Sequence, residues 1–98
     1  MAVTFHIPGP LQSFADGRRL VHLEIAPASL AEALDALFMV YPGIRDRLLN
    51  EQGIIREHIN LFIGNEDIRY LGGLAATLAD ASEIVIVPAV SGGLKKTT

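Results

Sequence analysis

The side chains that could perform acid–base or metal chemistry are few in this sequence. His6, His22 and His58 are its histidines, and the first two could be neighbours on the outer face of a hairpin. No carboxylate is obviously paired with them, so we interpret them as solvent-facing strand residues. Asp46, Asp67 and Asp80 lie in separate turns without calcium-loop spacing, and there is no cysteine. The sequence therefore predicts no bound metal and no enzyme.

The remaining candidate for chemistry is backbone, namely Gly92-Gly93 near the C-terminus. Glycine has no Cβ, so two in succession allow close approach to a nucleotide or passage through a narrow channel. The stretch from Pro88 to Gly93 can span about 17 Å at roughly 3.3 Å per residue, enough to reach a buried site in another protein. Gly72-Gly73 is interpreted as a turn, because apolar sheet sequence follows it.

Composition limits the classes of protein. Ninety-eight residues make one domain, and the net charge of -3 with scattered basic residues argues against nucleic-acid binding. No apolar run approaches the roughly 20 residues that cross a bilayer, so no membrane is expected. The N-terminus lacks the pattern of a signal peptide, and we predict a cytoplasmic protein.

Hydrophobic spacing predicts the first half of the chain. Residues 3–7 and 21–25 alternate apolar and polar side chains, which indicates two strands of a hairpin with a turn at Asp16-Gly17. Ser29 with Glu32 three positions later fits a capping box. The apolar residues that follow have helical spacing up to Pro42-Gly43, which should end the helix. A further short helical turn is expected at 44–49.

The second half predicts mainly strands. Residues 59–63 form a strand, 64–67 a turn, 68–70 a short strand, 71–81 a compact connection and 83–87 a last strand that ends at Pro88. This order predicts an α+β, ubiquitin-like β-grasp fold: a mixed sheet of four to five strands with one main helix across it. The first and last strands should lie parallel in its middle. We place the domain at 1–90 and a flexible tail at 91–98.

The sequence INLFIGNEDIRY at 59–70, Gly72-Gly73-Leu74, and IVIVPAVSGG at 84–93 resemble the MoaD/ThiS sulfur carriers. The resemblance covers Ala2 to Gly93 and is strongest to the CysO-type branch, which serves cysteine synthesis. A bare Gly-Gly is weak evidence for this family. A Gly-Gly that lies a few residues beyond an apolar last strand and Pro-Ala-Val is strong evidence for it.

The resemblance implies an activity for the tail. An activating enzyme would adenylate the carboxylate of Gly93 with ATP, and sulfur would displace AMP to leave a thiocarboxylate. Ser91 and Gly92 would thread into the enzyme, and no cofactor would be bound to this chain itself. The sulfur acceptor would be a cysteine-synthase-like enzyme or the large subunit of molybdopterin synthase. A ubiquitin-like modifier joined to proteins through Gly93 is the alternative.

One feature departs from the family pattern. Its members commonly end at the diglycine, whereas this chain continues from Leu94 to Thr98. We expect a pro-form that a JAMM-type metalloprotease cleaves between Gly93 and Leu94. The alternative is a tail added by cloning or annotation.

Parity on the strands predicts a docking face. Aligning the diglycine with that of ubiquitin puts Val85 and Val87 on the open face of the sheet and the neighbouring isoleucines under the helix. On strand 59–63 the same alternation turns Phe62 outward. Phe62, Val85 and Val87 are therefore the expected contact with partner proteins, unless loops cover them or they simply pack in the sheet.

Overall fold

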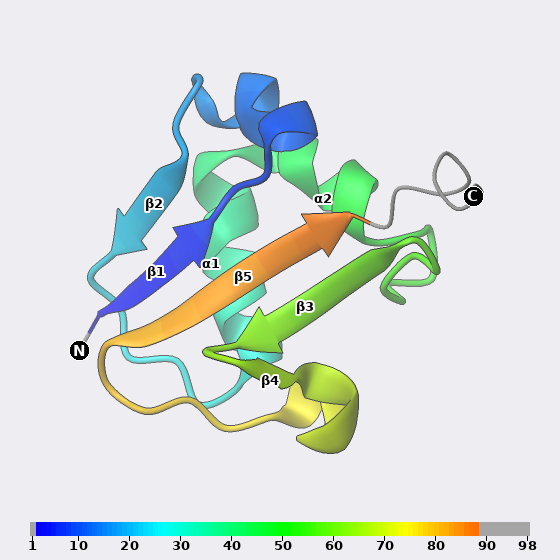
Figure 1. Ribbon diagram of the computed structural model, residues 1–98. Helices are drawn as coiled ribbons and strands as arrows, with labels where there is room; N and C mark the ends of the chain where they lie inside the picture. The colour runs from blue at the N-terminus through cyan, green and yellow to red at the C-terminus, as the bar shows by residue number, and fades with distance from the viewer. Residues whose placement is uncertain (1, 89–98) are drawn as a thin grey trace.

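Alternating apolar residues assemble one mixed sheet in the computed structural model, which describes residues 2–88. The strand order is β2-β1-β5-β3-β4 (Figure 1). The strands are β1 (Val3–His6), β2 (Leu20–Leu23), β3 (Ile59–Ile63), β4 (Glu66–Asp67) and β5 (Ser82–Pro88). This is the predicted β-grasp fold.

Strand β5 lies at the centre of the sheet. It pairs parallel to β1, with Phe5 opposite Ile84, and antiparallel to β3, with Leu61 opposite Ile86. The first and last strands are therefore adjacent and parallel, as predicted. Because residues in register point to the same face, these four side chains all enter one core.

Helix α1 (Leu30–Val40) begins at the predicted cap. The Ser29 Oγ accepts a hydrogen bond from the Glu32 N–H at 3.3 Å, and Glu32 Oε1 accepts one from the Ala28 N–H at 3.0 Å. The returning bond thus reaches the residue before the cap rather than the cap itself. The helix ends before Pro42, which occupies the first turn of a second helix, α2 (Pro42–Leu48). Proline is tolerated there because the first N–H groups of a helix have no partner within it.

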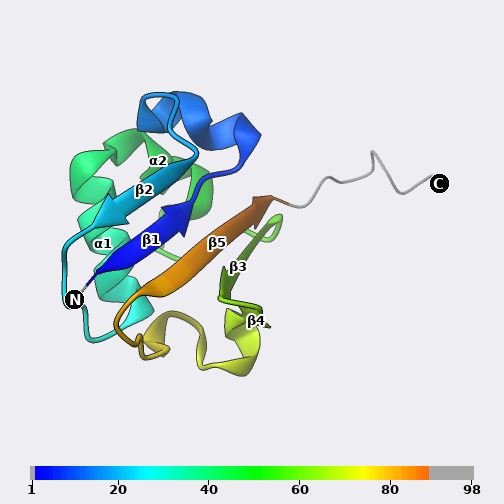
Figure 2. The same cartoon turned by 60° about the vertical axis from the view of Figure 1, so that its left-hand side comes forward.

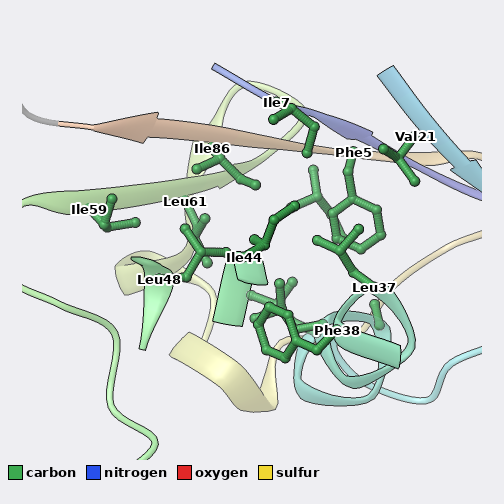
Figure 3. Packing of buried hydrophobic residues seen from close by; sticks show 14 of the residues in the cluster. Phe5, Ile7, Val21, Leu37, Phe38, Ile44, Leu48, Ile59, Leu61 and Ile86 are labelled. Atoms are coloured by element: carbon green, nitrogen blue, oxygen red, sulfur yellow. The ribbon is translucent and has the colours of Figure 1, made fainter. Parts of the chain in front are cut away.

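The core lies between the sheet and the two helices, which cover the same face (Figure 2). Figure 3 shows Ile44 and Leu48 of α2 near Leu61 and Ile86 of the sheet. These side chains, and that of Leu37 in α1, are at most 2% exposed. Within residues 2–88, no helix covers the opposite face of the sheet, which is called the open face below.

Three local predictions were wrong. Residues 68–70 form a 3-10 helix, η2 (Ile68–Tyr70), because the Asp67 carboxylate accepts a hydrogen bond from the Arg69 N–H and caps a turn. The short strand β4 lies one step earlier, inside the predicted turn, and β2 ends at Leu23 rather than at residue 25.

Two more 3-10 helices complete the fold. They are η1 (Gly9–Ala15), which follows the proline-rich end of β1 and was not predicted, and η3 (Gly73–Ala75), which supplies the helical turn expected at 71–81. Within residues 2–88, no helix has the length and apolar character needed to span a membrane.

Candidate functional site

A row of side chains crosses the open face through all five strands. The strand registers place His6 of β1 opposite Leu20 of β2 and opposite Val85 of β5. Val85 in turn lies opposite Phe62 of β3, and Phe62 opposite Asp67 of β4. We call these five residues the cross-strand row. It brings two of the three predicted docking residues into direct register.

The third predicted docking residue, Val87, lies on the same face two positions along β5, opposite Asn60. Val87 is 38% exposed, whereas Val85 and Phe62 are half-buried. Ile84 and Ile86 are buried under the helices, as predicted. The open face therefore has an apolar patch at Phe62, Val85 and Val87, and Val87 is its most accessible valine. The docking role of this patch stays a prediction.

The expectation that no carboxylate pairs with the histidines is wrong for two of them. His6 Nε2 lies 2.7 Å from Glu83 Oε1, and His22 Nε2 lies 2.7 Å from Glu24 Oε2. Glu83 reaches His6 because β1 and β5 run parallel side by side, although the two residues are 77 positions apart. Alternation within β1 and the predicted parallel pairing could have found this contact. The imidazoles remain solvent-facing, as predicted.

The ring nitrogens of these histidines lie close to oxygen atoms of neighbouring side chains. His22 Nδ1 is also 3.1 Å from Thr4 Oγ1, so its ring is held by neutral and acidic oxygens on both sides. No group of three or more metal-ligating side chains is found among residues 2–88. The His6–Glu83 contact therefore adds a polar pair to the open face, beside Val85 in the cross-strand row.

An ion pair closes the row at the β4 edge. Arg69 Nη2 lies 2.7 Å from Asp67 Oδ2, and the Asp67 side chain is only 11% exposed. The hydrogen bonds from the Arg69 guanidinium and from its backbone N–H lower the pKa of Asp67 below its ordinary value, and burial opposes this only in part. Asp67 is thus held ionised at the end of the row.

A shallow hollow lies on the other side of Val85, where β1 ends. It has a volume of about 390 Å³ and is lined by His6, Ile7, Pro8, Arg19, Leu20, Val85 and Ile86. Because β1 and β5 are parallel, the hollow adjoins the half of β5 that runs to Pro88. A partner seated on the cross-strand row could therefore place a side chain here, close to the point where the chain leaves the sheet (Figure 1).

The predicted chemical residues Ser91, Gly92, Gly93 and Leu94 lie outside the described residues. The structure fixes only their origin: β5 ends at Pro88, five positions before Gly93. The described part thus contains the open face, where docking is predicted, and ends at Pro88, from which the C-terminal segment continues.

Comparison with known proteins defines the class. The fold is that of small ubiquitin-like β-grasp proteins, and the chain matches the ThiS family over residues 5–93. The protein belongs to the ThiS family.

Its named relatives include sulfur carriers and modifiers. The chain is 34% identical to the sulfur carrier protein CysO of Mycobacterium tuberculosis, over 95% of this chain and 100% of the relative. It is 31% identical to small archaeal modifier protein 1 of Haloferax volcanii, over 79% of this chain and 85% of the relative. The solved BexX/CysO complex of Amycolatopsis orientalis contains a chain that is 35% identical, with a TM-score of 0.83 and coverage of 93% and 99%.

Proposed function

We propose that the protein is a sulfur carrier whose Gly93 becomes a C-terminal thiocarboxylate. The supporting observation is that the ThiS family match ends at Gly93, which leaves Leu94 to Thr98 outside it. An activating enzyme would join the Gly93 carboxylate to AMP from ATP and release pyrophosphate. Sulfide would then attack the acyl carbon and displace AMP, which leaves the thiocarboxylate. A persulfide donor would instead give an acyl disulfide, and a thiol would have to reduce its S–S bond to release the thiocarboxylate.

Cysteine synthesis is the proposed outlet for this sulfur. The support is the likeness to CysO, which extends over the whole of that relative. A cysteine-synthase-like enzyme would then be the acceptor, and a molybdopterin synthase large subunit the alternative. Supplying the thiocarboxylated protein to each enzyme, and measuring which one consumes it, distinguishes the two.

Removal of Leu94–Thr98 must precede activation, because the Gly93 carboxyl group is otherwise in a peptide bond. We assign this cleavage to a JAMM-type metalloprotease. The matched pair for the test is the full chain and a chain that ends at Gly93, each incubated with activating enzyme, ATP and sulfide. Intact mass should show an oxygen-to-sulfur exchange in the short chain alone, and exchange in the uncleaved full chain would refute the requirement.

The open face is the proposed contact with the activating enzyme. Phe62→Ser should weaken binding about tenfold or more, because it removes an aromatic side chain that lies beside Val85, the central residue of the row. Tyr70→Ser is the matched control, since Tyr70 is an aromatic residue that is 82% exposed outside the row. Equal affinities of the two variants, measured by calorimetry on folded protein, would exclude this face.

A protein modifier is the second candidate, favoured by the likeness to small archaeal modifier protein 1. Both functions use Gly93 and the same activation. Mass spectrometry of native extract separates them: lysine-linked adducts ending in Gly93 favour the modifier, whereas a free thiocarboxylate without adducts favours the carrier.

A further inference from the structure

Strand β2 leaves one edge of the sheet without a partner in the described chain. It pairs only with β1, and Figure 1 shows no element along its outer side. The Ile7 N–H donates to the Arg19 carbonyl at 2.8 Å, which sets the phase of the ladder. By alternation, Val21 bonds toward β1, and Leu20 and His22 direct their N–H and C=O groups outward. Such an edge is a template for another strand.

Apolar surface accompanies this edge. A groove of about 300 Å³ runs between β2 and the C-terminal end of α1, and it is lined by Arg18, Leu20, Val21, His22, Leu23, Val40 and Tyr41. Leu20 is 48% exposed and Val40 is 51% exposed. A strand added to β2 would cover both backbone groups and apolar side chains that now face water.

The charges at the two ends of β2 indicate which strand fits. Arg18 precedes β2, Glu24 follows it, and both are exposed. If a second copy pairs antiparallel with Val21 opposite the partner's Val21, Leu20 lies opposite the partner's His22. The same register puts Arg18 opposite the partner's Glu24, twice by symmetry. Glu24 uses Oε2 toward His22, so Oε1 is available to the arginine.

We propose that the protein forms a symmetric homodimer through antiparallel β2–β2 pairing. The outward N–H and C=O groups of Leu20 bond those of the partner's His22, which joins two sheets into one. Both open faces then lie on the same side of the joined sheet. Strands β1 and β2 of each copy separate the two β5 strands. A small interface of this kind has a Kd of about 10 µM to about 1 mM.

Charge reversal tests the register. Sedimentation velocity of the full chain at increasing concentration should show a monomer–dimer equilibrium. Arg18→Glu and Glu24→Arg should each weaken it about tenfold or more, because both symmetric pairs become repulsive. The double variant R18E/E24R should dimerise again. So should an equimolar mixture of the two single variants, as a mixed dimer with both pairs restored.

Two controls keep the test independent of folding. Arg45→Glu and Glu51→Arg change exposed charges away from β2 and should leave the equilibrium unchanged. The amide NMR signals of Leu20 and His22 should shift with concentration in the native chain. A chain that stays monomeric up to about 1 mM, or single variants that dimerise as well as the native chain, overturns the proposal. Failure of the double variant to recover also overturns it.

Discussion

Ile86 and Val87 are consecutive residues of β5 with opposite surroundings. Ile86 is 2% exposed beneath the helices, and Val87 is 38% exposed on the open face. Replacing each with alanine removes only apolar carbons and leaves the backbone of the central strand unchanged. The two variants therefore compare the two faces of one strand.

The burial of the two side chains determines how much unfolding free energy each variant should lose. Ile86→Ala deletes three buried carbons at about 0.8 kcal/mol each, and the cavity left in a packed core brings the loss to about 3–4 kcal/mol. Val87→Ala deletes two carbons that are already partly in water and leaves no closed cavity. Its loss is about 1 kcal/mol.

Urea unfolding measures both free energies, and the slope should not change between variants. The effects on binding to the activating enzyme should be the reverse of the effects on stability. Val87→Ala should weaken the affinity of the folded protein, and Ile86→Ala should leave that affinity unchanged. Equal losses of stability in the two variants would refute the parity on which the docking face depends.

Three further outcomes are expected. Ser29→Ala should lower the free energy of unfolding by about 1 kcal/mol in urea, because the Glu32 N–H loses its acceptor. Arg69→Met should raise the pKa of Asp67 toward its ordinary value of 3.8, measured by NMR titration. Because the pKa of Asp67 is lower in the folded chain than in the unfolded chain, the Asp67–Arg69 pair stabilises the native chain above pH 3.8. This contribution is lost as the pH falls through the folded pKa. Ala81→Gly should raise the thermal midpoint, because residue 81 has a φ of 62°, which glycine adopts without strain.

Periodicity was sufficient to predict most of the fold. Alternation located the main strands, and the Ser29–Glu32 pair located the start of α1. The order of the elements predicted the central place of β5, and the apolar residues on both faces of that strand agree with it. These features are encoded locally, in side-chain spacing and in one cap, so a single sequence reveals them.

The missed features depend on particular side-chain contacts rather than on the spacing of apolar residues. The strand expected at Ile68–Tyr70 is a 3-10 helix because the Asp67 side chain captures a backbone N–H. The His6–Glu83 contact joins the two ends of the chain and requires the register of β1 on β5. Alternation along single strands predicted Phe62, Val85 and Val87 on the open face. The continuation of the row through His6 to Leu20 was not predicted, because it also requires the register between strands.

The central position of β5 also has a mechanical consequence. Any pull on the chain beyond Pro88 acts along β5, which is bonded to β1 on one side and to β3 on the other. A force along a strand loads both ladders in shear, so their hydrogen bonds must fail together rather than one at a time. An unfolding machine that grips the C-terminus therefore meets the most resistant element first, and an enzyme can draw on that end without unravelling the domain behind it.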